Sequence, residues 1–248
     1  EEYKTIPDRL YIGNAFCHLL FPKEEQLFAL MEKAIVENVE ITLVFPCMRE
    51  FQVEERGKLL IKVDNWCEKR QTRVEILVND WGMTALVKES GKHLEPCLGV
   101  LLNKQKKDPR MRYKKGSTRG LGESNLQADF YRTFLKDTYG ITRYEWESCG
   151  YPQVFPQGKN SLHLPYYQTN TSQYCPLYAS CTAGERGKQR LPEHCPEYCE
   201  QYAYLYTEHL HMAGRYNSLF GLDEELVKHP EKLKAYQQSG IDRLVIGL

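Results

Sequence analysis

Short apolar, β-branched runs alternate with amphipathic stretches along most of this chain, and this alternation most constrains its fold. Strands separated by helices predict parallel pairing, because a parallel connection needs a long crossover. Eight such strands are what a closed (β/α) barrel requires. We predict strands at Leu10–Ala15, Ile41–Phe45, Arg73–Val78, Cys97–Leu101, Thr142–Glu147, Ser161–Pro165, Tyr216–Phe220 and Arg243–Gly247.

Helical spacing of apolar side chains fills most of the gaps between these strands. In the first such segment Leu27, Met31 and Ala34 recur on one face. The predicted helices are Glu24–Glu37, Glu54–Arg70, Met83–Ser90, Leu126–Tyr139 and Asp223–Gln238.

The alternation is incomplete in its second half. No clear helix separates the fifth and sixth strands, and nothing follows the eighth. We therefore expect an α/β fold with one (β/α) TIM-barrel-like domain over residues 1–248, distorted or incomplete. The polar stretch Tyr166–Pro192 predicts a long loop within a Cys-bearing insertion at about residues 166–200. Loops of that length are usually functional or disordered, and a bound metal would order this one.

Charge and hydrophobicity narrow the class of protein. Lys+Arg and Asp+Glu both number 33, which argues against nucleic-acid binding by bulk electrostatics and leaves only a local patch. No run approaches the ~18 apolar residues of a membrane span. The polar start has no signal-peptide character, so we expect a cytoplasmic protein without a membrane span.

The nine cysteines predict a metal site, because clustered cysteines in the reducing cytosol seldom form disulfide frameworks. Cys175, Cys181, Cys195 and Cys199 form the pattern C-x5-C-x13-C-x3-C. Thiolates suit iron–sulfur clusters and zinc. The last spacing predicts two sulfurs on one face of a helical turn. The pattern lacks the paired C-x2-C of zinc ribbons, which favours a cluster over zinc. Burial of all four as free core cysteines is the alternative.

Other cysteines fall into two groups. Cys17 directly follows the first predicted strand, and Cys47 and Cys149 also follow strands. The loops after barrel strands share one face, so Cys17 can converge with the later set. Cys67 in a helix and Cys97 at a strand start are expected to be core residues.

Three stretches resemble the peptidase U32 family, and within it the UbiV-like proteins of oxygen-independent ubiquinone synthesis. Their order and spacing span most of the chain. They are Tyr11–Cys17 (Tyr-Ile-Gly-Asn-Ala-Phe-Cys); Val78–Gly82 followed by Gly99–Arg110; and Leu162–Tyr166 followed by Tyr174, Cys175, Cys195 and Cys199.

The resemblance implies a barrel-like fold and a [4Fe-4S] cluster held by four cysteines. An upstream ligand of the UbiV type maps onto Cys17, and the last two map onto Cys195 and Cys199. Local context selects Cys175 as the remaining ligand, whereas spacing selects Cys181; if both bind, Cys17 drops out.

The resemblance also implies a function. Characterised relatives take part in hydroxylation without dioxygen, on a quinone precursor or on RNA bases. We expect an anaerobic-type iron–sulfur protein acting on a small aromatic substrate or RNA, with a homologous U32 chain as a heterodimer partner. A metal-stabilised binding or scaffold protein, with a cluster or zinc, is the alternative. A U32-type protease is third, since no G-x-S-x-G or H-E-x-x-H motif is present.

Polar side chains at predicted strand ends are candidates for catalysis. Glu145 and Glu147 share one face of the fifth strand, and one can act as a general acid or base. Salt bridging and helix capping are the structural alternatives. The catalytic candidates are Asp80, Glu147 and His163.

A basic run follows the fourth predicted strand. Lys104–Arg119 contains eight Lys and Arg residues against one acid, Asp108. Such a run is usually a solvated loop, but here it can hold a phosphate, a carboxylate or RNA. The substrate-binding candidates are Asn79, Asn103, Lys104, Gln105 and Arg110.

Overall fold

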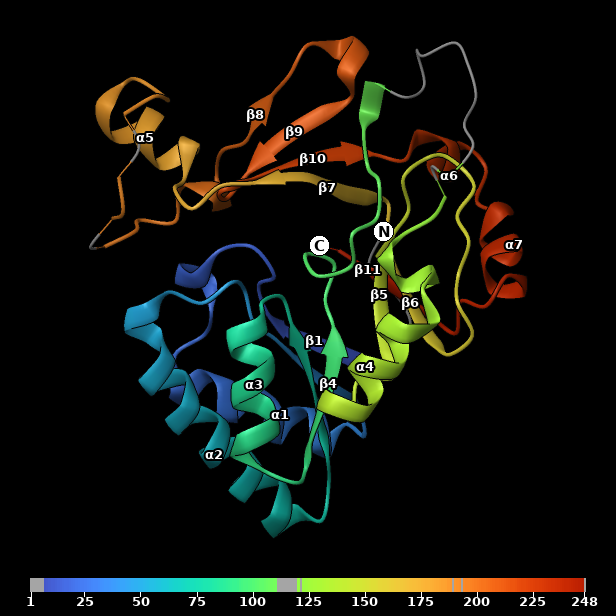
Figure 1. Cartoon of the computed structure of the whole chain (residues 1–248). Coiled ribbons are helices and arrows are strands. Elements are labelled where there is room, and N and C mark those ends of the chain that lie inside the picture. The colour runs from blue at the N-terminus through green and yellow to red at the C-terminus, as the bar shows by residue number, and fades with distance from the viewer. Residues whose placement is uncertain (1–6, 111–119, 121, 189, 193, 248) are drawn as a thin grey trace. The chain divides into compact units, whose positions relative to one another are not determined.

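The computed structural model describes residues 7–110, 120, 122–188, 190–192 and 194–247. These residues fall into two compact units (Figure 1). Unit 1 is Glu1–Leu102 with Thr133–Thr142, and unit 2 is Asn103–Arg132 with Arg143–Leu248. Both contain parallel strands together with helices, so the predicted α/β class is confirmed. The single TIM-barrel-like domain stays a prediction.

Unit 1 contains four parallel strands in the order β1-β2-β3-β4, and a helix connects each strand to the next. β2 and β3 are almost continuously buried, as expected for parallel strands covered on both faces. The elements are β1 (Arg9–Gly13), η1 (His18–Leu20), α1 (Glu24–Val36), β2 (Glu40–Val44), η2 (Glu50–Gln52), α2 (Val53–Arg70), β3 (Val74–Val78), α3 (Trp81–Ser90) and β4 (Leu94–Leu98).

One buried amide ties the carboxyl ends of these strands together. Asn79 follows β3 and donates from Nδ2 to the carbonyl of Phe45 at 2.9 Å. Its Oδ1 accepts from the N–H of Leu101 at 3.3 Å. A Cβ atom at Gly99 would lie 2.2 Å from that oxygen, so this position requires glycine. The predicted substrate ligand Asn79 therefore has a structural role in unit 1.

Unit 2 contains a three-stranded parallel sheet in the order β5-β6-β11. Arg143 pairs with both carboxylate oxygens of Asp242, at 2.9 and 2.7 Å, and so joins β5 to the start of β11. The same carboxylate accepts from the backbone N–H of Asn160 at 2.9 Å. The strands are β5 (Arg143–Glu147), β6 (Lys159–Leu164) and β11 (Arg243–Ile246).

A second sheet in unit 2 is antiparallel, with the order β7-β10-β9-β8. Short helices precede, follow and separate these strands in sequence order. The helix α4 (Asp129–Tyr139) belongs partly to each unit. The remaining elements are η4 (Asn125–Gln127), β7 (Tyr166–Thr171), α5 (Pro176–Ala183), η5 (Tyr198–Glu200), β8 (Tyr204–Leu205), η6 (Glu208–Leu210), β9 (Met212–Arg215), β10 (Ser218–Leu222), α6 (Glu224–Lys228) and α7 (Lys232–Gln238).

Several predictions about the second half are wrong. The strand expected at Tyr216–Phe220 is the antiparallel β10, and Tyr216 lies in the turn before it. The loop expected at Tyr166–Pro192 contains β7 and α5. The helix expected at Asp223–Gln238 is two helices, because Pro230 cannot continue the ladder of helical hydrogen bonds. In unit 1, the strand expected at Cys97–Leu101 ends at Leu98.

The Arg143–Asp242 pair predicts a pH-dependent contribution to stability. Burial alone raises the pKa of Asp242, but the hydrogen bond and charge of Arg143 and the Asn160 N–H outweigh it, so the pKa is lowered. A depressed pKa contributes stability above the unfolded-state value and loses it as pH falls through the folded-state value. We expect Asp242→Asn to lower the urea midpoint at pH 7, modestly because the carboxylate is 45% exposed.

The difference between wild type and Asp242→Asn should shrink below about pH 4, near the ordinary carboxyl pKa. Asp137→Asn, at an exposed position on α4, is the control and should change little at either pH. A difference that persists unchanged at pH 2.5 would contradict this account.

Candidate functional site

Cys175 precedes α5, and its thiol has two hydrogen-bond partners. The Sγ atom donates to the carbonyl of Tyr216 at 3.0 Å and accepts from the backbone N–H of Tyr178 at 3.3 Å. Pro176 occupies the first turn of the helix, where a missing N–H costs little. The Cys175 sulfur is thus fixed at the amino end of α5.

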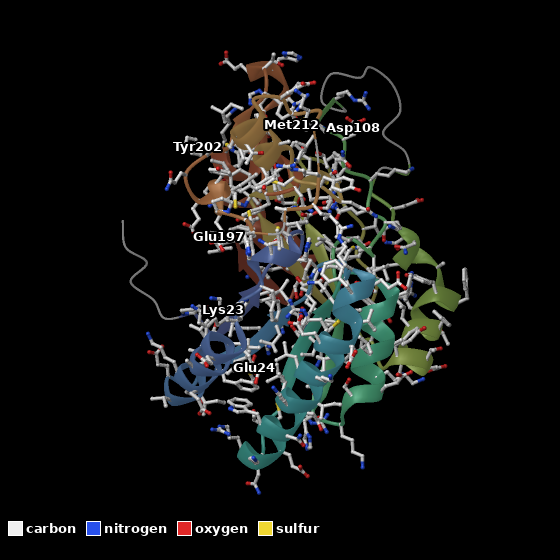
Figure 2. All side chains as sticks on the ribbon, turned by 90° about the vertical axis from the view of Figure 1, so that its left-hand side faces the viewer. Lys23, Glu24, Asp108, Glu197, Tyr202 and Met212 are labelled. Carbon is white, nitrogen blue, oxygen red and sulfur yellow. The ribbon has the colours of Figure 1, made fainter. Side chains whose placement is uncertain are left out.

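Cys199 lies buried in η5, which packs against α5 through the rings of Tyr198 and Tyr178, with centroids 6.4 Å apart. Glu197, labelled in Figure 2, precedes this short helix with φ 57°. The prediction that Cys195 and Cys199 share one helical turn is wrong, because this left-handed residue separates Cys195 from the helix.

The turn between β9 and β10 holds both cysteine-bearing segments. Arg215 Nε donates to the carbonyl of Cys199 at 3.0 Å, and the carbonyl of the next residue, Tyr216, accepts from Cys175. Tyr216 has φ 56°, which is uncommon for a residue other than glycine. Its ring contacts the Arg215 guanidinium at 5.1 Å and the Phe220 ring at 6.4 Å. Two adjacent residues therefore bring the α5 and η5 cysteines to one place.

Cys181 lies on α5, the helix that follows Cys175, and Cys195 lies four residues before Cys199 in the chain. Burial raises the pKa of the Cys175 thiol, the N–H groups of Tyr178 and Leu177 lower it, and the charges of Cys195 and Cys181 raise it again. None of the four is recorded in a disulfide among the described residues. We call Cys175, Cys181, Cys195 and Cys199 the four-thiol site.

The spread of the four thiols distinguishes between metal groups. Zinc bound to thiolates at about 2.3 Å brings the sulfurs within about 3.8 Å of one another. No three of these four described thiols lie within 4.8 Å of one another, so they do not form a closed zinc tetrahedron. An iron–sulfur cluster has several atoms between its ligands and holds them further apart.

Cys17 lies in unit 1, whereas the four-thiol site lies in unit 2. Its backbone N–H donates to Asn14 Oδ1 at 2.8 Å, and the residue is buried. Its place among the cluster ligands stays a prediction.

Three further cysteines have the character of core residues. Cys67, Cys97 and Cys149 are buried, as predicted for the first two. Burial raises the pKa of Cys67 and of Cys149 to about 12, so both thiols stay protonated at neutral pH. Cys149 was expected to be near the site by its position after a strand; it contacts Gln105 Nε2 at 3.5 Å.

One face of β5 and β6 carries titratable side chains. Glu145 and Glu147 share this face, as their alternation predicts, and Glu147 lies beside His163 in the strand register. His163 Nε2 lies 2.6 Å from Glu145 Oε2, and the Glu145 side chain is fully buried. A carboxylate that pairs with a histidine in this way fixes the orientation of the ring. Two predicted catalytic candidates, Glu147 and His163, are therefore neighbours.

Glu147 forms a buried ion pair with Lys107, whose side chain is 7% exposed against 4% for the carboxylate. Glu147 Oε1 also accepts from the backbone N–H of Gln168 at 2.9 Å. The sequence does not distinguish Lys107 as a buried residue, because it stands among other basic residues.

Two alternate residues of the segment before Lys107, Asn103 and Gln105, contact β5. Asn103 Nδ2 donates to the carbonyl of Glu145 at 2.9 Å. Gln105 donates to the carbonyl of Glu147 at 2.7 Å and accepts from its N–H at 3.2 Å. This two-residue period, visible in the sequence, was the signal that Lys107 points the same way. Asn103 therefore contacts β5 at Glu145 and Gln105 contacts it at Glu147, and their predicted part in substrate binding stays a prediction.

The other predicted residues divide between structural and surface roles. Asp80 caps α3 through the Met83 N–H at 2.8 Å, and its second oxygen accepts from the Met48 N–H at 2.8 Å. These bonds support the capping interpretation over the catalytic one. Lys104 is exposed. Arg110 pairs with Asp108, which is labelled in Figure 2. The rest of the basic run, Arg112, Lys114, Lys115 and Arg119, lies outside the described residues.

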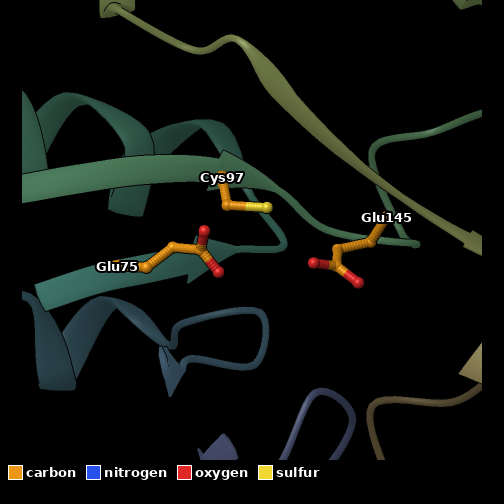
Figure 3. Close-up of side chains that lie close together, drawn as sticks. All are labelled: Glu75, Cys97 and Glu145. Carbon is orange, nitrogen blue, oxygen red and sulfur yellow. The ribbon is translucent and has the colours of Figure 1, made fainter. Parts of the chain in front are cut away.

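Glu75, Cys97 and Glu145 are drawn in Figure 3. In unit 1, Glu75 on β3 accepts from the Thr42 hydroxyl at 2.8 Å, and Cys97 lies buried on the neighbouring β4. In unit 2, Glu145 pairs with His163. Each carboxylate therefore has a partner within its own unit.

No family model, curated protein or solved structure matches this chain. Among the described helices, none is both long and apolar enough to span a bilayer.

The Lys107–Glu147 pair predicts a pattern of stability changes. We expect Lys107→Met to lower the free energy of unfolding by about 3–5 kcal/mol, because it leaves a buried carboxylate unpaired. The double variant Lys107→Met/Glu147→Gln should recover most of that loss, since the neutral amide still accepts from the Gln168 N–H. Urea unfolding at pH 7 measures both values.

Lys104→Met, at an exposed position on the same segment, is the matched control and should change the free energy of unfolding by less than about 0.5 kcal/mol. A double variant as unstable as Lys107→Met alone would show that the ion pair does not dominate this site.

Proposed function

We propose that this chain is an iron–sulfur protein whose cluster is held by the four-thiol site. The observation that carries the proposal is the pair of bonds from the β9–β10 turn, Cys175 thiol to Tyr216 carbonyl and Arg215 to Cys199 carbonyl. They hold two cysteine-bearing segments together that have little other regular structure. Free thiols gathered in this way suit a soft metal group.

The proposed ligands are Cys175, Cys195 and Cys199, and either Cys181 or Cys17 supplies the fourth thiolate. When bound, a cluster of this kind supplies one-electron transfer. Within the chain, Tyr178 and Tyr216 orient the Cys175 sulfur, and Arg215 orients the Cys199 backbone. The proposal extends, through the U32 resemblance alone, to oxygen-independent hydroxylation or a related modification of an aromatic small molecule or nucleobase. A homologous U32 chain is the proposed partner.

The face that carries Glu145, Glu147 and His163 is the proposed place for proton transfer. Carboxylates and histidine are the usual general acids and bases. The contacts that support this part are the His163–Glu145 bond and the Lys107–Glu147 pair, both at the carboxyl ends of parallel strands. In α/β proteins that end of the sheet is where sites assemble.

Metal and sulfide analysis of the full chain, purified under strict anaerobiosis, tests the proposal. We expect about four iron and four acid-labile sulfide atoms per chain, as a [4Fe-4S] cluster requires. The protein should be brown, with a visible absorption that dithionite bleaches. A colourless protein with one zinc per chain would instead support the metal-stabilised scaffold, and a protein without either metal would sink both.

Cysteine variants then assign the ligands. Cys175→Ser and Cys199→Ser should lose most of the bound iron, because serine is a poor ligand for a soft metal. Cys149→Ala, which removes a buried thiol of the same unit, is the matched control and should keep its iron. The fourth ligand is whichever of Cys181→Ser and Cys17→Ser also loses iron. Full iron content in Cys199→Ser would contradict the ligand set.

A further inference from the structure

Two guanidinium groups accompany the four-thiol site. Arg215 donates to the Cys199 carbonyl at 3.0 Å and lies over the Tyr216 ring. Arg186, three residues after α5, donates to the Tyr206 hydroxyl at 3.1 Å and lies 5.9 Å from the centroid of the Tyr204 ring. Both arginines rest on aromatic rings, which favour cations over their faces.

Within the part of the chain that the structure describes, Arg186 and Arg215 form no ion pair with a carboxylate. Other arginines do so, as in the Arg143–Asp242 and Arg110–Asp108 pairs. Unneutralised positive charge in one neighbourhood favours a negatively charged occupant.

Tyr204 connects Arg186 to the thiols. Its hydroxyl donates to the Pro176 carbonyl at 2.9 Å and contacts Ser180, both on α5. Burial raises the pKa of this phenol, the charge of Cys181 raises it further, and Arg186 lowers it. Arg186 therefore lies over a ring whose hydroxyl contacts α5, the helix that carries Cys181.

A cluster held by thiolates is anionic, and one-electron reduction adds a further negative charge. A nearby cation stabilises the reduced form more than the oxidised form, since Coulomb attraction grows with the charge. Net charge around a cluster is one of the factors that sets its reduction potential. The same argument predicts a lower potential when such a cation is removed.

We propose that Arg186 and Arg215 raise the reduction potential of an iron–sulfur cluster at the four-thiol site. The inference rests on the proposed function. Both arginines are positioning residues, which act on the bound group through charge and, for Arg215, through the Cys199 backbone.

Anaerobic redox titration of the cluster-loaded full chain, with dithionite as reductant, tests the proposal. We expect Arg186→Gln and Arg215→Gln to have midpoint potentials more negative than wild type, by up to a tenfold change in the oxidised-to-reduced ratio, or about 59 mV for one electron. Arg186→Lys and Arg215→Lys keep the charge and should stay close to wild type.

Lys232→Gln is the charge-matched control, because it removes one positive charge from α7, far from α5 within unit 2 (Figure 1). Its potential should equal that of wild type. Arg215→Gln also removes a bond to Cys199, so if it fails to assemble a cluster, Arg186→Gln decides the question.

A loaded Arg186→Gln protein with the wild-type potential overturns the inference and leaves the proposed function intact. Failure of the wild-type chain to assemble a cluster overturns both. The two failures are distinguished by the iron content of the wild-type protein.

Discussion

The two bonds from the β9–β10 turn are the constraint on which the cysteine-bearing part of unit 2 depends. Among the described residues between β7 and β8, the helical elements are α5 and η5, and both are short. A short helix has little stability of its own, so tertiary contacts must fix it. The Tyr216 carbonyl holds the start of α5, and Arg215 holds η5. The positive φ of Tyr216 aims that carbonyl, and strain of this kind persists only where surrounding contacts maintain it.

The regular part of the fold was predictable because its physical signals are local. α1 and α2 repeat their apolar residues at helical spacing, and β2 and β3 are short, mostly buried segments rich in Val, Ile and Leu. The antiparallel sheet escaped prediction because its strands lack such runs. In β7, with the sequence Tyr-Tyr-Gln-Thr-Asn-Thr, only Tyr167 and Gln168 are buried. Its pairing with β10 depends on residues about fifty positions away, which no local pattern reveals.

The cysteine pattern of the candidate site can be found in the sequence, whereas the residues that hold its segments together cannot. Four cysteines in a polar stretch indicated a metal group, and the structure brings their segments together. Neither Arg215 nor Tyr216 carries a motif, and their roles arise from backbone geometry. The buried role of Lys107 could not be predicted, because a basic run normally predicts solvated side chains. What distinguishes Lys107 is its place in the alternation Asn103, Gln105, Lys107. This alternation can be interpreted only when the structure shows that β5 lies beside the segment.

That alternation also gives the segment three separate contacts with β5. The segment contacts β5 through three side chains in succession, those of Asn103, Gln105 and Lys107, and Lys107 is the last of them in the chain. Local opening requires far less free energy than global unfolding, and it starts where the fewest contacts hold. When the Lys107 contact opens locally, the Glu147 carboxylate is uncovered while the Asn103 side chain still contacts β5. Solvent entry to this carboxylate is therefore separable from unfolding of the sheet that carries it.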